Sequence, residues 1–335
     1  MLGAMTRAWA LFLLLPAVSQ AAACVTAQGC TEWVKLGNGP ARSLIYRTYS
    51  LDSPNEHITR ALIMVHGAGR DADNYFRTAV AAAFLAGALD DTVVIAPRFA
   101  SNDGRGCRDT LASNEVSWSC NGNSWRSGGP ATSHPDLTSY DLMDELLRRL
   151  ARKDMFPRLA NIVVTGHSAG GQFVTRYEMV NRVHDDLGVP VKYVVANPSS
   201  YAYLDATRPT TDGKEFRNFS DARNCTTFDQ WPYGLKGRSG YAAKLSDDQI
   251  KRQLAARPTM YLVGELDTLP LAGFDSSCPA MAQGPTRQAR GEAFVKYVNQ
   301  KFGAKHDAMV VPLCGHNARC MFTADPVLAI LFPKP

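Results

Sequence analysis

The sequence predicts an α/β fold in which a mostly parallel, twisted sheet carries helices on both faces. Two observations lead to this prediction. Short, nearly continuous apolar runs recur along the chain, and segments with the apolar spacing of amphipathic helices lie between them. Strands that are apolar along their whole length are buried on both faces, as in parallel sheets, and their alternation with helices is typical of α/β proteins.

The elements follow one another in a regular order. Apolar runs predict strands at 43–50, 61–67, 92–98, 161–166, 191–197, 259–264 and 308–315. Amphipathic spacing predicts helices at 73–87, 138–153, 169–184, 285–302 and 323–331. The chain contains no internal repeat, so we expect one domain over residues 24–335.

Two long stretches break this alternation. Residues 99–136 are rich in glycine, serine and asparagine and predict a disulfide-stapled loop, and residues 198–257 predict a cap-like insertion. Both stretches follow the carboxyl ends of strands, where open α/β sheets bind ligands. Trp118, Trp125 and Tyr201 are therefore candidate substrate contacts, with packing in a small satellite core as the alternative.

Residues 1–23 are predicted to be a secretory signal peptide. Arg7 is followed by the apolar run AWALFLLLPAV and then by SQAAAC, whose small residues suit cleavage. This apolar run is shorter than a membrane-spanning helix requires. We therefore expect a secreted or periplasmic protein, with lipid anchoring through Cys24 as the alternative.

The eight cysteines of this predicted exported chain predict four disulfides. Short separations favour Cys24–Cys30, Cys107–Cys120 and Cys314–Cys320, which leaves Cys225 to pair with Cys278. The chain has no C-x-x-C motif, so neither a metal nor a redox site is expected.

Charge and hydropathy exclude other classes of function. The formal net charge is +5, and no run of five or more basic residues occurs, so nucleic-acid binding gains no support. No segment beyond the N-terminal run is long and apolar enough to span a membrane. The oligomeric state is not indicated by the sequence.

A G-x-S-x-G motif joins a predicted strand to a predicted helix. The buried strand ends at Gly166, and the motif reads Gly166-His167-Ser168-Ala169-Gly170. In a sharp strand-to-helix turn the glycines relieve crowding of the backbone and the serine is exposed at the edge of the sheet. Ser168 is therefore the candidate nucleophile.

A serine nucleophile needs a base and an acid that orients the base. Asp267 lies in a turn just beyond the strand at 259–264 and is the preferred acid, with Glu265 and then Asp275 as alternatives. His316 follows the last strand and is the preferred base. The other histidines adjoin the serine, belong to another motif, or lie in less suitable places: His57, His66, His134, His167, His184 and His306.

The loop after the strand at 61–67 is the candidate oxyanion-binding segment. It reads His66-Gly67-Ala68-Gly69 and leads toward a helix. Such a loop can turn backbone N–H groups toward the nucleophile. We expect the oxyanion to be held by the N–H of Ala169 together with that of Ala68 or Gly69.

Together these residues resemble the α/β-hydrolase superfamily. Its serine elbow matches the motif around Ser168, and its acid and base match Asp267 and His316, in the order Ser, Asp, His. The resemblance extends over about residues 40–333 and implies the α/β-hydrolase fold with an inserted cap or loop region. The predicted export, the early H-G-x-G loop and the cysteines are also loosely similar to extracellular polyester depolymerases and feruloyl esterases.

The resemblance implies a secreted serine hydrolase that cleaves a small or polymeric carboxylic ester through an acyl-enzyme. It implies no metal and no organic cofactor. Two alternatives stay open, because one fold can serve several functions. One is an amidase or peptidase with the same triad, and the other is a non-catalytic binding protein with the same fold.

Overall fold

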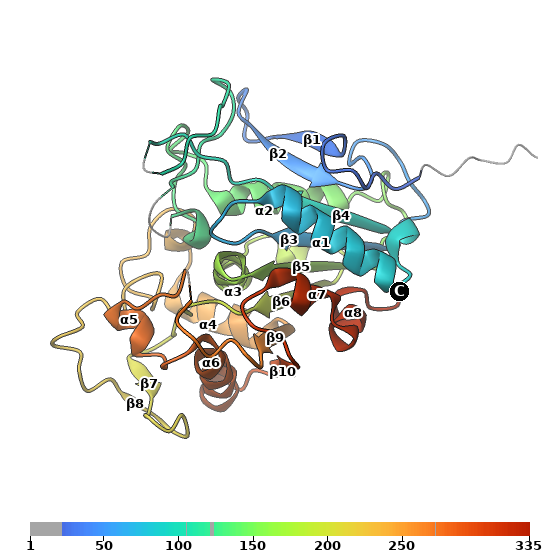
Figure 1. Ribbon diagram of the computed structural model, residues 1–335. Coiled ribbons are helices and arrows are strands. Elements are labelled where there is room, and N and C mark those ends of the chain that lie inside the picture. The colour runs from blue at the N-terminus through green and yellow to red at the C-terminus, as the bar shows by residue number, and fades with distance from the viewer. Residues whose placement is uncertain (1–21, 105, 121–123, 272) are drawn as a thin grey trace, which may run out of the picture.

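The computed structural model describes residues 22–335, apart from residues 105, 121–123 and 272. All but the last two residues of the predicted signal peptide lie outside the described residues. An eight-stranded sheet runs through the domain, with helices on both of its faces (Figure 1). The predicted α/β fold with a mostly parallel sheet is confirmed.

The strand order across the sheet is β1-β2-β4-β3-β5-β6-β9-β10. The first two pairings, β1 with β2 and β2 with β4, are antiparallel, and every other pairing is parallel. All seven predicted strands are present, and β1 is an addition at the edge. The bounds are β1 Thr31–Lys35, β2 Arg42–Arg47, β3 Arg60–Val65, β4 Thr92–Pro97, β5 Asn161–His167, β6 Val191–Ala196, β9 Thr259–Gly264 and β10 Asp307–Val311.

Alternate side chains of the central strands enter two separate apolar cores. In β3, Leu62 and Met64 pack on the face covered by α1, α7 and α8, whereas Ile63 and Val65 pack on the opposite face. That opposite face is covered by α2, α3, α4 and α6 (Figure 1). Burial on both faces explains why these strands are apolar at nearly every position.

The five predicted helices correspond to α1, α2, α3, α6 and α8, whereas α4, α5 and most of α7 were not predicted. Their bounds are α1 Ala72–Leu85, α2 Ser139–Leu150, α3 Ala169–Val180, α4 Asp247–Ala256, α5 Cys278–Met281, α6 Arg287–Phe302, α7 Ala318–Thr323 and α8 Asp325–Leu331. The segment predicted as a helix at 323–331 overlaps the end of α7 and contains α8. None of the helices among the described residues is long and apolar enough to cross a bilayer.

The two stretches that break the alternation contain further structure. Residues 99–136 are crossed by the Cys107–Cys120 disulfide. Residues 198–257 contain a hairpin of β7 (Thr207–Pro209) and β8 (Phe216–Asn218), and also α4, which packs against α3. The four disulfides are the pairs that the cysteine spacing predicted. Cys225–Cys278 links the segment that follows the hairpin to α5.

Candidate active site

Ser168 occupies the turn between β5 and α3, at the carboxyl edge of the sheet. Its φ is 59° and its ψ is −116°, a conformation that is strained for a residue with a Cβ atom. The side chain is 8 % exposed, and its hydroxyl donates a hydrogen bond of 2.9 Å to Nε2 of His316. The strained turn thus holds the hydroxyl toward an imidazole from a distant part of the chain.

Glycines make this turn sterically possible. A Cβ atom on Gly166 would lie 2.5 Å from the backbone of Gly170, and one on Gly170 would lie 2.2 Å from the carbonyl oxygen of Val65. One on Gly171 would lie 2.6 Å from the carbonyl oxygen of Ala196. Because α3 approaches both neighbouring strands so closely, all three positions require glycine.

We expect Gly170→Ala to prevent stable folding. The added methyl group meets rigid backbone of β3, so the free energy of unfolding should fall by about 3 kcal/mol or more. Urea unfolding of the purified protein measures this loss. Gly39→Ala is the matched control, since its Cβ would meet nothing within 4 Å and should change stability by less than about 0.5 kcal/mol. Equal stability of the two variants would contradict this account of the turn.

The imidazole of His316 is held on its other side by Asp267. Nδ1 of His316 donates a hydrogen bond of 2.8 Å to Oδ2 of the carboxylate, which is fully buried. Asp267 lies in the loop after β9, where its N–H bonds to the carbonyl of Gly264 at 3.0 Å. The three side chains predicted from the sequence as nucleophile, base and acid therefore form one hydrogen-bonded chain.

The two alternative carboxylates point elsewhere. Oε2 of Glu265 accepts a hydrogen bond of 2.8 Å from the N–H of Leu313 and so joins the loops after β9 and β10. Asp275 accepts hydrogen bonds from Tyr233 at 2.8 Å and from Ser277. Neither carboxylate is bonded to His316, whose Nδ1 bonds to Asp267 instead.

A disulfide closes the loop that carries His316. Cys314 and Cys320 enclose the histidine and three further residues that line the pocket described below: Asn317, Ala318 and Arg319. Cys314 is buried against the sheet, and the N–H of Leu266 bonds to its carbonyl at 2.9 Å. The disulfide therefore holds His316 and one wall of the pocket together.

Replacing both cysteines, as in Cys314→Ser/Cys320→Ser, should lower both stability and activity. Loss of so short a loop constraint costs about 2 kcal/mol, and a displaced imidazole should lower kcat roughly 100-fold. Cys24→Ser/Cys30→Ser is the matched control, because that disulfide has the same sequence separation of 6 residues and lies near the N-terminus. The control should lose stability and keep kcat; equal loss of kcat in both would refute a local role for Cys314–Cys320.

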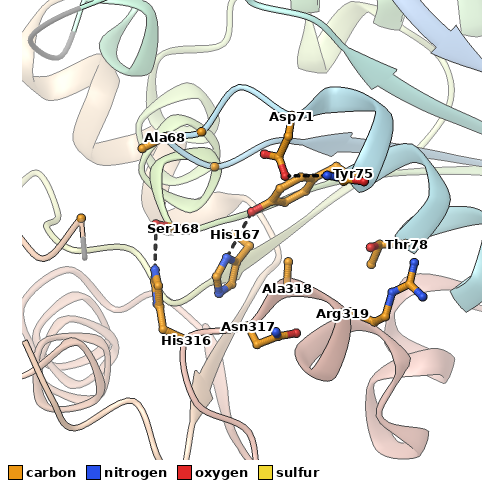
Figure 2. A pocket seen from close by; sticks show the side chains of 14 residues that line it. Ala68, Asp71, Tyr75, Thr78, His167, Ser168, His316, Asn317, Ala318 and Arg319 are labelled. Atoms are coloured by element: carbon orange, nitrogen blue, oxygen red, sulfur yellow. Dashed lines mark hydrogen bonds between the residues drawn. The ribbon is translucent and has the colours of Figure 1, made fainter. Parts of the chain in front are cut away.

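The loop after β3 forms the side of the site opposite His316 (Figure 2). Gly67, Ala68 and Gly69 line the pocket beside Ser168. Ala169 is the first residue of α3, where backbone N–H groups have no acceptor within the helix. Both segments predicted to bind an oxyanion are thus next to Ser168.

His66 and His167 are buried and support the site from behind. Nε2 of His66 accepts a hydrogen bond of 3.1 Å from the N–H of Phe99, and burial lowers its pKa to about 4. His167 packs its ring 4.5 Å from that of His316, and its Nδ1 lies 3.3 Å from the hydroxyl of Tyr75. Burial lowers the pKa of His167 well below its ordinary value, so both rings are neutral near pH 7.

A pocket of about 700 Å³ opens beside Ser168, between the residues of α1 and α7 (Figure 2). Polar groups line both walls, with Asp71 and Asn74 on one side and Asn317 and Arg319 on the other. Within the described part of the chain, no group of three or more His, Cys, Asp or Glu side chains could hold a metal ion. The pocket gives a bound molecule direct access to the hydroxyl of Ser168.

The three aromatic side chains expected to contact substrate lie in the core instead. Trp118 and Trp125 are 0 % and 2 % exposed and pack around Phe99. Tyr201 is fully buried and stacks on Phe294 at 4.5 Å. The expectation of substrate contact is therefore wrong, because all three rings pack in the apolar core, Trp125 against Phe173 of α3 and Tyr201 against Phe294 of α6.

Asn197 and Arg287 belong to the site but were not identified from the sequence. Asn197, at φ 46° after β6, accepts a hydrogen bond of 2.8 Å from the N–H of Gly264 and donates one of 3.4 Å to the carbonyl of Gly315. It thereby joins the loops that carry Asp267 and His316. Arg287 contacts Asp267 directly. The only signal in the sequence was the position of Asn197 at the end of the strand predicted at 191–197.

Comparisons with known proteins agree with the fold. A family model described as the alpha/beta hydrolase family matches residues 62–330. The poly(3-hydroxybutyrate) depolymerase LpqC from Bordetella parapertussis has a similar structure, with a TM-score of 0.61 and 20% identity over 88% of this chain and 85% of that one. Poly(aspartic acid) hydrolase-1 from Sphingomonas sp. KT-1 is similar at a TM-score of 0.60 and 22% identity, over 87% and 94% of the two chains. A search of curated proteins found no match.

Proposed function

The chain belongs to the alpha/beta hydrolase family, and from this premise we propose that it is a serine hydrolase that cleaves carboxylic esters. One observation carries the proposal. Ser168, His316 and Asp267 are joined by hydrogen bonds of 2.9 Å and 2.8 Å at the edge of an open pocket. A serine bonded to an oriented imidazole is the arrangement that acyl transfer requires.

In the first half of the proposed reaction, Oγ of Ser168 attacks the carbonyl carbon of the ester. Nε2 of His316 takes the hydroxyl proton, and Asp267 stabilises the imidazolium that forms. The carbonyl oxygen becomes an oxyanion, held by N–H groups of Ala169 and of Ala68 or Gly69. The tetrahedral intermediate then expels the alcohol, which receives the proton from Nε2 and leaves an acyl-enzyme.

In the second half, water replaces the alcohol. Nε2 of His316 takes a proton from the water, whose oxygen attacks the acyl carbon. Collapse of the second tetrahedral intermediate breaks the bond to Oγ, returns the proton to Ser168 and releases the carboxylic acid. All of these steps use side chains and backbone groups that lie at the pocket, and none uses a metal or an organic cofactor.

The pocket supports a substrate with polar groups near the scissile bond. Its walls expose the side chains of Asn74, Asn317 and Arg319. Its openness to solvent suits either a small ester or one segment of a polymeric ester. We also propose that the stretches 99–136 and 198–257 contribute to the choice of substrate, since both follow strands at the edge where Ser168 lies.

We further propose that the protein is exported. Four disulfides support an oxidising compartment, such as the periplasm or the extracellular space. The described Cys24 is bonded to Cys30, which favours a cleaved signal peptide over lipid anchoring at Cys24. Mass spectrometry of the mature N-terminus tests both alternatives.

The proposed activity is tested with matched substrates and an active-site probe. Purified protein should turn over p-nitrophenyl acyl esters much faster than the corresponding anilides, and a fluorophosphonate should modify Ser168. Faster turnover of the anilides would favour an amidase or peptidase. Absence of both turnover and labelling would favour a non-catalytic binding protein.

A further inference from the structure

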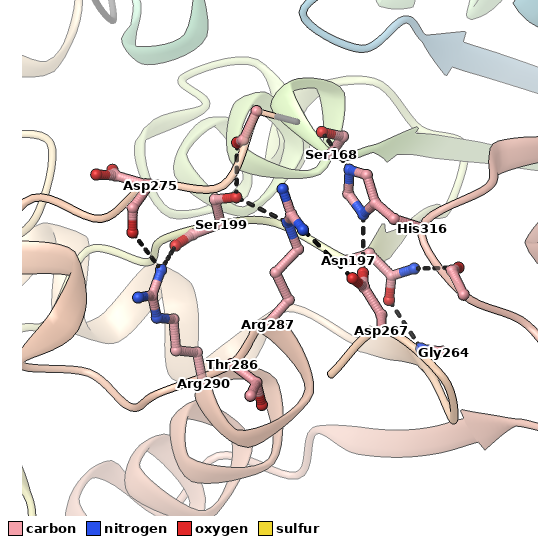
Figure 3. A network of polar contacts seen from close by, with 12 residues as sticks. Ser168, Asn197, Ser199, Gly264, Asp267, Asp275, Thr286, Arg287, Arg290 and His316 are labelled. Atoms are coloured by element: carbon pink, nitrogen blue, oxygen red, sulfur yellow. Dashed lines mark hydrogen bonds and ion pairs between the residues drawn. The ribbon is translucent and has the colours of Figure 1, made fainter. Parts of the chain in front are cut away.

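The carboxylate of Asp267 has a second buried partner besides His316 (Figure 3). Its Oδ2 accepts from the imidazole, whereas its Oδ1 lies 3.3 Å from a terminal nitrogen of Arg287. The side chains of Asp267 and Arg287 are both 0 % exposed. Each carboxylate oxygen of Asp267 therefore accepts from its own donor, His316 or Arg287, and rotation of the carboxylate would break both contacts.

Arg287 is itself held by neighbours on the other side of the site. Its Nε donates a hydrogen bond of 2.8 Å to Oγ of Ser199, and that hydroxyl donates one of 3.1 Å to the carbonyl of Gly273 in the pocket wall. The guanidinium also lies 5.2 Å from the ring centre of Phe274. The fork geometry of the guanidinium thus joins Asp267 to the pocket wall, which a lysine cannot reproduce.

The position of Arg287 in its helix is unfavourable for the helix alone. Arg287 is the first residue of α6, directly after the N-cap Thr286. A cation at a helix N-terminus is opposed by the helix dipole, and burial of a guanidinium without a counter-charge is costly. The contact with Asp267 offsets both effects. This indicates that Arg287 is placed for its contact with Asp267 and not for the stability of α6.

We propose that Arg287 is a positioning residue, which fixes the orientation of Asp267 and moderates the negative charge that the carboxylate presents to His316. This inference rests on the proposed serine hydrolase function. It does not require Arg287 to touch the substrate, because its side chain is buried behind Asp267.

The proposal has a consequence for the pH dependence of activity. Asp267, the neutral ring of His167 and Ser168 face His316 directly, while Asp71 lies across the pocket, Arg319 on the same disulfide-closed loop as His316, and Glu265 on the neighbouring loop. Removal of the Arg287 charge leaves the carboxylate field at the imidazole stronger, which favours the protonated imidazole. Because the base must be unprotonated, the acidic limb of the activity profile should move to higher pH.

Arg290 provides a matched control on the same helix. It is fully buried, like Arg287, but its guanidinium donates to the carbonyl oxygens of Gly284, Ser199 and Asp275. Arg290→Met therefore removes a buried cation without removing a partner of Asp267. If Arg287 had only a structural role, its variants would show the same loss of kcat as Arg290→Met.

The experiment compares Arg287→Met, Arg287→Lys and Arg290→Met with the unaltered protein. For each we measure kcat and KM on a p-nitrophenyl ester and the rate at which a fluorophosphonate labels Ser168, from pH 5 to pH 9. Arg287→Met should lower kcat about 100-fold with little change in KM. The pH at which its labelling rate is half-maximal should rise by about 0.5 to 1 pH unit. Arg287→Lys keeps the charge and should keep the midpoint, with kcat lowered about 10-fold.

The outcomes separate this inference from the proposed function. No labelling of the unaltered protein would refute the serine hydrolase itself. Normal labelling with an unshifted midpoint in Arg287→Met, or with the same kcat loss as in Arg290→Met, would overturn the positioning role alone. Where Arg287→Met does not fold, Arg287→Lys decides: an unchanged kcat overturns the proposal, and a selective loss of kcat supports it.

Discussion

Replacing Ser168 with alanine is expected to lower kcat on an ester substrate about a millionfold. In the proposed mechanism Oγ of Ser168 forms the acyl-enzyme, and in the structure its hydroxyl is bonded to Nε2 of His316. Its removal leaves the loop proposed to bind the oxyanion and the pocket intact, so a weak residual activity from binding alone should persist. The fold should be preserved, because alanine fits the strained turn at least as easily as serine.

The measurement pairs turnover of a p-nitrophenyl ester with intact-mass analysis after fluorophosphonate treatment. Ser168→Ala should gain no adduct and should unfold at the same temperature as the unaltered protein. Ser277→Ala is a suitable control, since its exposed hydroxyl bonds to Asp275 and lies outside the hydrogen-bonded chain of Ser168. Persistent labelling or turnover in Ser168→Ala would mean that another residue is the nucleophile.

The fold was predictable where burial produces strong sequence patterns. The central strands are apolar at nearly every position because both faces are covered, and this pattern gave their positions to within a few residues. The edge strand β1 escaped prediction since only Val34 of its five residues is buried. Helix α4 also escaped, because only Ile250 and Leu254 face the core, although Ser246 and Gln249 form a capping box that signals its start.

The candidate site could be predicted for those residues whose position follows from the order of the strands along the chain. Ser168, Asp267 and His316 each follow a strand, and parallel strands bring their carboxyl ends to one edge of the sheet. Arg287 begins helix α6, which follows the short helix α5, and nothing in its local sequence indicates that it reaches Asp267. For Trp118 the sequence left substrate contact and core packing both open, because the choice depends on its tertiary contact with Phe99.

Asp267→Asn is expected to lower kcat about 10,000-fold while the structure is preserved. The reason lies in how the new amide would be oriented. Arg287 is a donor and therefore selects the amide oxygen at the position of Oδ1. The NH₂ group must then face Nδ1 of His316, which becomes an acceptor, and the ring proton moves to Nε2. In that tautomer Nε2 cannot take the proton of Ser168.

Glu265→Gln separates this effect from a general loss of carboxylate charge near the base. Oε2 of Glu265 accepts only from the N–H of Leu313 among the described hydrogen bonds, and a glutamine oxygen can replace it there. Its kcat should therefore stay within about 3-fold of the unaltered protein, since removal of a nearby exposed charge is worth only about 0.5 kcal/mol. Steady-state kinetics on the same ester compares the two variants, with urea unfolding as the check on stability. A large loss in Glu265→Gln and a small one in Asp267→Asn would reverse the assignment, because the imidazole would then be oriented by the other carboxylate during turnover.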